Sequence, residues 1–268
     1  MLEALGLPFF QHALIAGVLI AVAIGLIGPL TMANRMTFMS GGIAHATYGG
    51  VGAALFFGFS VLAGAAAAAL VASALISFIA YRHAHRADTA IGIVWAVGMA
   101  LGVILTDLTP GYNVDLMSFL FGSILAVDTM DLWYMAGFDL VVIALVWYFY
   151  YDFMALSFDP VFARLQGVKT QLLHFLLLVL VAMAVVLAMR LVGLIMVIAL
   201  LTMPSFSSER FVRSLGGMML FSVALSILYI VLGLLFAFRF DLSSGASVIL
   251  VAAFGTIALF LMKRVFAK

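Results

Sequence analysis

Long apolar runs, separated only by short polar interruptions, are the feature that most constrains the fold of this chain. A helix needs about 20 apolar residues to cross the roughly 30 Å hydrocarbon core of a bilayer. Runs of about this length lie at 9–29, 37–57, 61–80, 90–106, 132–151, 172–189, 191–206, 218–237 and 244–262. They are too long for strands, and they lack the alternation of apolar and polar residues that is typical of an outer-membrane barrel. The sequence therefore predicts an all-α polytopic membrane protein with about nine transmembrane helices.

The sixth and seventh runs are short and share a break at 190–193. If one of them is incomplete, the count becomes eight. The connections leave no room for an extramembrane domain, so residues 1–268 are expected to form a single transmembrane domain. The residues before the first run include Glu3 but no Lys or Arg, unlike the start of a cleavable signal peptide. The first run is therefore expected to remain as a helix.

Composition excludes several classes of function. Hydrophobic residues make up 67% of the chain and charged residues 9%, whereas soluble domains are about 45–50% apolar. The formal net charge of +1 is too small to attract nucleic acid electrostatically, so no nucleic-acid partner is expected. The absence of cysteine leaves only nitrogen and oxygen as metal ligands. The sequence contains neither a Walker-type glycine loop nor a serine or carboxylate pattern typical of catalysis, so we expect neither an enzyme nor a bound cofactor.

The distribution of charge predicts the orientation in the membrane. Basic residues lie in every second interruption, at Arg35, Arg82, Arg86, Arg164, Lys169, Arg210, Arg213, Lys263, Arg264 and Lys268. The other interruptions hold Asp107, Asp115, Asp128, Asp131 and Asp241, with Arg190 and Arg239. Because cytoplasmic loops carry the excess of Lys and Arg, we expect the N-terminus outside and the C-terminus in the cytoplasm. This orientation requires an odd number of spans, which nine satisfies.

Two further segments have a structural interpretation. Residues 116–127 are apolar but only about half a membrane deep, and they predict a re-entrant or interfacial segment. The second run is rich in glycine, at Gly41, Gly42, Gly49, Gly50 and Gly52. Small residues at such spacing let helix backbones approach closely, so tight packing against another helix is expected.

His45 is the most informative polar residue, because an ionisable group inside a span is costly and is by default a functional hypothesis. On a helix it shares one face with Gly41, Gly49 and Gly52, and this strip of little side-chain bulk is a candidate lining for a narrow path. The alternative is a neutral histidine that bonds a neighbouring helix. His12 and His174 lie near span ends, and we assign them no role.

Residues 158–168, with the sequence FDPVFARLQGV, predict a short helix in a cytoplasmic loop. Asp159 suits the N-cap, a proline follows at the first helical position, and Gly167 suits the left-handed residue that closes the helix. Phe162 and Leu165 lie on one side of this helix beside Arg164. An apolar face in a loop indicates docking on a partner or, alternatively, on the protein's own membrane helices.

Five segments, taken in order, resemble the membrane subunits of zinc, manganese and iron ABC importers. They are RMTFMSGGIAHA at 35–46, DTAIGI at 88–93, VDLMSFLFGSIL at 114–125, FDPVFARLQGV at 158–168, and RLVG at 190–193 followed by ALLTMP at 199–204. The fourth is similar to the family's cytoplasmic coupling helix, and the fifth to its break between two inner spans. The likeness extends through most of the chain.

The resemblance implies a homodimeric permease in a prokaryotic cytoplasmic membrane, with two ATP-binding subunits inside and a metal-loaded solute-binding protein outside. This chain would form the channel, whose two copies open alternately to each side. His45 would lie on the metal pathway. Asp159, Phe162, Arg164, Leu165 and Gly167 would belong to the coupling helix.

The metal expected from this resemblance is zinc, manganese or iron. Many family members carry an Asp four residues before the histidine, where this chain has Gly41, and some zinc-linked members have a histidine where it has Ala96. A lone imidazole suits zinc better than manganese, which prefers oxygen, so zinc is favoured.

A self-sufficient carrier or channel is the alternative function. Such a protein is expected to contain inverted repeats or acidic residues deep in its spans. The aspartates of this chain are instead assigned to loops, which favours the importer subunit.

Overall fold

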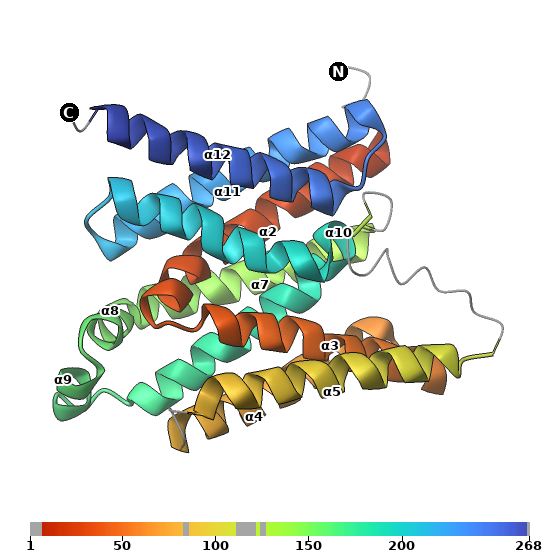
Figure 1. Ribbon diagram of the computed structural model, residues 1–268, viewed down its shortest axis with the longest axis horizontal. Coiled ribbons are helices and arrows are strands. Elements are labelled where there is room, and N and C mark those ends of the chain that lie inside the picture. Colours follow the sequence, from red (N-terminus) through yellow and green to blue (C-terminus); the bar gives the residue numbers. More distant parts are fainter. Residues whose placement is uncertain (1–6, 83–85, 111–121, 124–126, 267–268) are drawn as a thin grey trace. The chain divides into compact units, whose positions relative to one another are not determined.

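The computed structural model describes residues 7–82, 86–110, 122–123 and 127–266, and all regular structure within these ranges is helical (Figure 1). The helices are α2 (Pro8–Ala33), α3 (Thr37–Phe57), α4 (Val61–Arg82), α5 (Ala87–Asp107), α7 (Thr129–Tyr148), α8 (Tyr150–Phe158), α9 (Pro160–Leu165), α10 (Thr170–Phe211), α11 (Leu215–Phe240) and α12 (Ser244–Phe266). The prediction of an all-α protein is confirmed.

Seven helical segments in the described residues are long and apolar enough to cross a membrane: α2, α4, α5, α7, the first 20 residues of α10, α11 and α12 up to Val265. The other two expected spans are also helical, as α3 and the second part of α10, but they are not among these seven. The multi-pass architecture is confirmed, and the count of nine stays a prediction. The expected re-entrant segment, 116–127, lies outside the described residues except for Gly122, Ser123 and Val127.

The predicted break at 190–193 is present within α10. Gly193 has φ 76° and ψ 163°, a conformation that no helix contains and that glycine adopts without steric cost. Near the break, the Ser244 hydroxyl at the start of α12 donates to the carbonyl oxygen of Leu191 over 3.1 Å. Gly122 also packs here, since a Cβ atom on it would lie 2.6 Å from the Gly193 nitrogen. The break is thus held by neighbouring segments.

The helices form two compact units. Unit 1 comprises residues 1–32, 117–150 and 188–268, and unit 2 comprises residues 33–116 and 151–187. Within their described parts, unit 1 holds α2, α7, the second part of α10, α11 and α12, while unit 2 holds α3, α4, α5, α9, most of α8 and the first part of α10.

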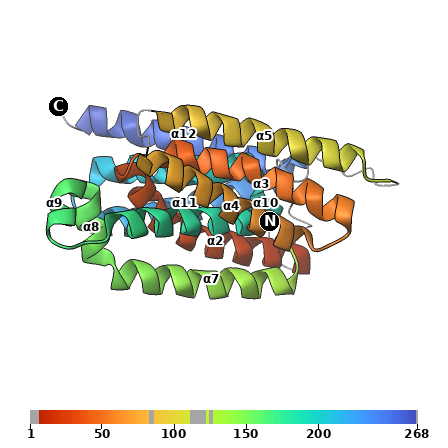
Figure 2. The same ribbon diagram turned by 90° about the horizontal axis from the view of Figure 1, so that it is seen from below.

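Unit 2 is built around α3, which packs between α4 and α5 (Figure 2). The α3–α5 contact is backbone to backbone: a Cβ atom on Gly49 would lie 2.9 Å from the carbonyl oxygen of Gly98, and one on Gly52 would lie 2.8 Å from the Cα of Gly102. The two helices run parallel, because the contacts advance together along both. The tight packing expected from the glycines of the second run is confirmed.

In unit 1, α2 packs on α11 at a similarly close distance, since a Cβ atom on Gly25 would lie 2.5 Å from the Cα of Val223. Hydroxyl groups then join the later helices. Ser205 lies 3.3 Å from Ser222, and Ser207 donates to Thr256 over 3.3 Å. These bonds connect the second part of α10 to α11 and α12, as polar side chains do between membrane helices.

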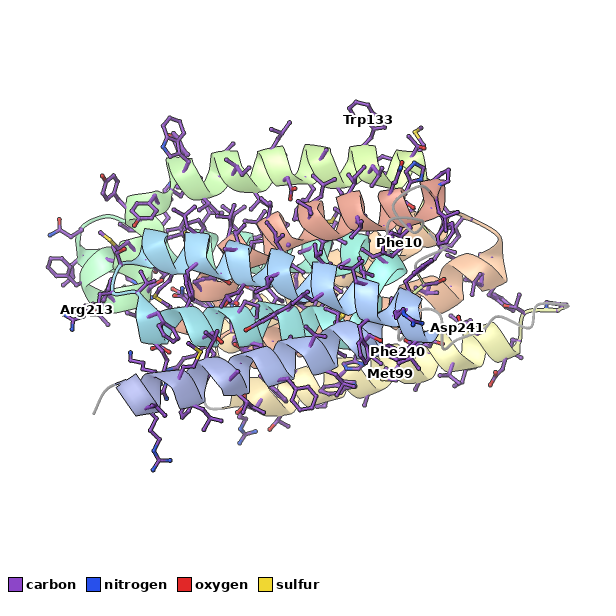
Figure 3. The ribbon with its side chains drawn as sticks, turned by 90° about the horizontal axis from the view of Figure 1, so that it is seen from above. Phe10, Met99, Trp133, Arg213, Phe240 and Asp241 are labelled. Carbon is purple, nitrogen blue, oxygen red and sulfur yellow. The ribbon has the colours of Figure 1, made fainter. Side chains whose placement is uncertain are left out.

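Basic residues gather at one end of each unit. In unit 2 the start of α3 meets α8 through the bond from Asn34 to Ser157, and Arg164 lies over the Tyr81 ring near the end of α4. The five basic residues of this end are Arg35, Arg82, Arg86, Arg164 and Lys169. In unit 1, Lys263 donates to the carbonyl oxygen of Arg210, whereas Arg213 and Asp241 lie at opposite ends of α11 (Figure 3). This separation of charge agrees with the alternation read from the sequence.

The α3–α5 contact predicts a specific sensitivity to side-chain volume. We expect Gly52→Leu to lower the free energy of unfolding by about 1–3 kcal/mol, because the added atoms would push apart two backbones that touch. Gly92→Leu is the matched control on α5, where an added Cβ meets nothing within 4 Å. Thermal unfolding of both variants in detergent would measure this, and an equal loss in the two would contradict the packing argument.

Candidate metal pathway and coupling helix

His45 lies near the middle of α3 and stacks on Trp95 of α5. Their ring centroids are 4.1 Å apart and their planes differ by 4°. The Trp95 ring is held in turn, since its Nε1 donates to the sulfur of Met99 over 3.3 Å. The backbone contacts described above bring the two helices close enough for this stacking. Sequence reasoning found His45 but not the tryptophan on which it rests.

The imidazole has an unused ligand atom. Nδ1 of His45 is buried and has no hydrogen-bond partner among the described residues. Buried polar atoms are nearly always paired, so an unpaired ring nitrogen is a candidate for binding something that is not part of this chain. The alternative expectation, a histidine that bonds a neighbouring helix through this nitrogen, is not met in the described residues.

The glycine strip expected to line a path beside His45 has a mixed role. Gly49 and Gly50, with Ala46 and Ala53, line an apolar groove of about 500 Å³ between α3, α4 and α5. Gly52 is instead covered by Gly102 of α5. His45 itself does not line this groove.

The described residues contain no group of three or more His, Asp or Glu side chains that could hold a metal ion. Gly41, at the position where the family often has a carboxylate, is buried and has no donor to offer. A metal ion at His45 would therefore find no closed site of the structural kind among the described side chains.

Asp139 is an ionisable residue that sequence reasoning missed. It lies in α7, where only 6% of its surface is exposed, and its carboxyl group interacts with the backbone of Ala23 on α2. The assignment of the aspartates to loops was wrong for this residue. Its position eight residues after Asp131, deep inside the run 132–151, could have identified it as an ionisable residue within a span.

The predicted short helix after residue 158 is present as α9. The Asp159 carboxylate accepts hydrogen bonds from the amides of Val161 and Phe162, over 3.0 and 2.9 Å, and Gly167 has φ +87°. Both capping predictions are confirmed. Phe162 and Leu165 are 56% and 81% exposed, so this chain's own helices do not cover its apolar face. The residue that docks on the chain is Ala163, which is fully buried.

The described helices are those of a multi-pass membrane protein, with one histidine on a close-packed, glycine-rich helix and an exposed capped helix between spans. Residues 6–263 match the family described as the ABC 3 transport family, and the chain belongs to that family. It is the permease subunit of an ABC metal importer and carries no catalytic domain.

Relatives agree over nearly the whole chain. It is 45% identical to an uncharacterized membrane protein of Synechocystis, covering 94% of this chain and 90% of the relative. It is 35% identical to the manganese import system permease protein ScaB of Streptococcus gordonii, covering 91% and 88%. Among solved structures, PsaBC from Streptococcus pneumoniae in complex with Fab matches with a TM-score of 0.87 and 31% identity, covering 97% of this chain and 94% of that chain.

The environment of Asp139 leads to a stability prediction. We expect Asp139→Leu to lower the free energy of unfolding by about 1 kcal/mol, because it removes the buried polar interaction with the backbone of Ala23. Asp139→Asn should stay close to the parent protein, since its amide oxygen can make the same interaction. Thermal unfolding in detergent would compare the two, and equal losses would mean that the carboxyl group itself is required.

Proposed function

We propose that two copies of this chain form the channel of an ATP-driven importer of a divalent transition metal ion, with His45 as a transit ligand on the pathway. Membership of the family supports the transport class. The observation that carries the role of His45 is its buried, unpartnered Nδ1, held in place by stacking on Trp95. Because one imidazole cannot hold a metal alone, further ligands would come from water, the second copy or the solute-binding protein.

Manganese is the ion that the relatives favour, since several are named as manganese import permeases. The chemistry of the described residues favours zinc instead, because a lone nitrogen ligand without a neighbouring carboxylate suits zinc better. We propose manganese as the main substrate and retain zinc as the alternative. Uptake of each ion alone, and then of manganese in the presence of excess zinc, would separate the two.

We infer that the basic ends of both units face the cytoplasm, which leaves the N-terminus outside and the C-terminus inside. The clustering of Arg and Lys at one end of each unit supports this orientation. It gives α9 a cytoplasmic position. We propose that α9 is the coupling helix and that its exposed apolar face docks on an ATP-binding subunit, with Arg164 at the edge of that contact.

In this mechanism, ATP binding draws the two ATP-binding subunits together and α9 transmits their motion to the membrane helices. The channel between the two permeases then opens alternately to each side of the membrane. A metal-loaded solute-binding protein delivers the ion from outside. This chain supplies the pathway, and no chemical step occurs on it.

The role of His45 can be tested by uptake. We expect His45→Ala to reduce the initial rate of manganese uptake by roughly tenfold or more, since loss of groups that tune a metal site typically costs that much. His12→Ala is the control, because we assign that histidine no role. Manganese accumulation by whole cells, with equal amounts of assembled transporter, is the measurement. Unchanged uptake would remove His45 from the mechanism.

The role of α9 can be tested separately. We expect Phe162→Ala combined with Arg164→Glu to abolish ATP-driven uptake, because an exposed aromatic anchor and its neighbouring charge are lost together. The control is Val265→Ala with Arg264→Glu, which makes a matched change at the exposed end of α12. Uptake into vesicles loaded with ATP would be compared, and persistent transport in the α9 variant would leave that helix with a structural role only.

A further inference from the structure

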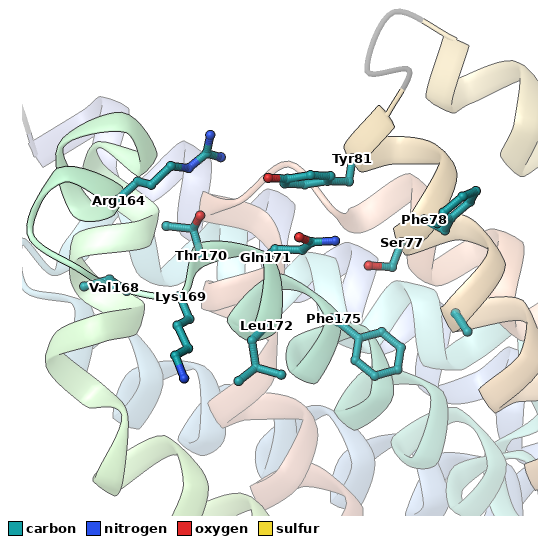
Figure 4. Close-up of a pocket in the computed structure, with 11 residues that line it drawn as sticks. Ser77, Phe78, Tyr81, Arg164, Val168, Lys169, Thr170, Gln171, Leu172 and Phe175 are labelled. Carbon is teal, nitrogen blue, oxygen red and sulfur yellow. The ribbon is translucent and has the colours of Figure 1, made fainter.

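A cleft of about 570 Å³ lies at the basic end of unit 2, between the end of α4 and the start of α10, next to α9. We call it the basic cleft and define it by Tyr81, Arg164, Lys169, Gln171, Leu172 and Phe175. Figure 4 shows Tyr81 extending from α4 on one side, with Arg164 from α9 and Gln171 from α10 on the other. The coupling helix and the first span of α10 thus share this cleft.

The cleft carries positive charge that the described residues do not neutralise. Arg164 and Lys169 are both exposed, and neither forms an ion pair with a described residue. The Arg164 guanidinium lies over the Tyr81 ring, 5.9 Å from the ring centroid. Asp159, the acidic residue of the α9 segment, already accepts the two amide bonds of the N-cap. Figure 4 shows the Arg164 and Lys169 side chains extending in opposite directions, so Arg164 with the neighbouring Tyr81 hydroxyl matches an anion such as phosphate, and Lys169 adds to the positive charge of the cleft.

The apolar residues of the cleft lie further into the spans than the Arg164 guanidinium (Figure 4). Leu172 and Phe175 follow Lys169 by about one and two helical turns along α10, toward the interior of its span. Phe78 precedes Tyr81 by about one turn on α4, which is also toward the span interior. Leu172 and Phe78 are 54% and 55% exposed, so this wall is open to an apolar occupant. A free phosphate ion would leave it unused, whereas an acyl chain would cover it.

We propose that the basic cleft binds an anionic phospholipid, with the phosphate group at Arg164 beside the Tyr81 hydroxyl and an acyl chain along Leu172, Phe175 and Phe78 (Figure 4). Basic clefts between membrane helices at the cytoplasmic face have the chemistry to hold such headgroups. The lipid links α4, α9 and α10 and stabilises the position of α9. This inference requires that the helices span a bilayer, and it is independent of which metal is carried.

The test is native mass measurement on the delipidated permease in complex with its ATP-binding subunit. Phosphatidylglycerol, phosphatidylcholine of the same chain length, or inorganic phosphate is added back in turn. We expect phosphatidylglycerol to bind roughly tenfold tighter than phosphatidylcholine. The double variant Arg164→Gln and Lys169→Gln should lose that preference.

The matched control is Lys263→Gln with Arg264→Gln, which removes the same charge at the basic end of unit 1 and should keep the preference. Equal loss in both variants would mean a diffuse attraction to the membrane and would overturn the proposal. Occupancy by inorganic phosphate that blocks the lipid would also overturn it in favour of a free anion site. Leu172→Gln adds a second criterion, because it should weaken binding of phosphatidylglycerol by several-fold.

The same mass spectra show whether the ATP-binding subunit remains attached. Failure of lipid binding in an intact, transport-active complex would overturn this inference and leave the proposed transport function standing. Loss of uptake in a His45 variant with normal lipid binding would support the proposed transport role of His45 and would leave the lipid site unaffected.

Discussion

The hydrocarbon core of the bilayer offers no hydrogen bonds, and every other feature of this chain follows from that constraint. Each backbone amide and carbonyl group must be paired inside its own segment, which makes helices the structure of these apolar runs. Lipid is as apolar as leucine, so the helices associate through close packing. This close packing is tightest where backbones approach each other, at Gly49 and Gly98, Gly52 and Gly102, and Gly25 and Val223.

The same constraint makes unpaired polar atoms informative. Serine and threonine hydroxyls in these helices mostly bond to a carbonyl one turn earlier, as Thr47 does to Ile43 and Thr106 to Gly102. Near the break in α10, a bond from Ser244 uses the carbonyl of Leu191. Against this background the unpartnered Nδ1 of His45 is an exception. Two hydroxyl groups of α11, on Ser226 and Tyr229, are also buried without a partner among the described residues, and of these three groups the imidazole is the one suited to bind a metal ion.

Parts of the site were predictable because they depend on neighbours in sequence. The cap of α9 needs only Asp159, the proline after it and Gly167 within nine residues. The break at Gly193 was predicted from the interruption at 190–193 between two short apolar runs. Asp139 was not found because a single carboxyl group hardly changes the hydropathy of a long run. It interacts with the backbone of Ala23, which lies more than a hundred residues away in the sequence. The stacking of Trp95 on His45 likewise joins two helices that no local pattern relates.

The sequence by itself determined the class of protein: a helical, multi-pass membrane chain with alternating basic and acidic ends, a capped helix between spans and a resemblance to metal importers. These properties depend on composition and on spacing within about one helix, where local energetics decide. Only the tertiary structure decided which faces meet. It placed Trp95 beneath His45, buried Asp139, left Phe162 exposed and brought Tyr81, Arg164 and Lys169 around one cleft. The physical reason is that close packing between two helices decides which of their faces meet. This packing depends on residues of both helices, which lie far apart in the sequence.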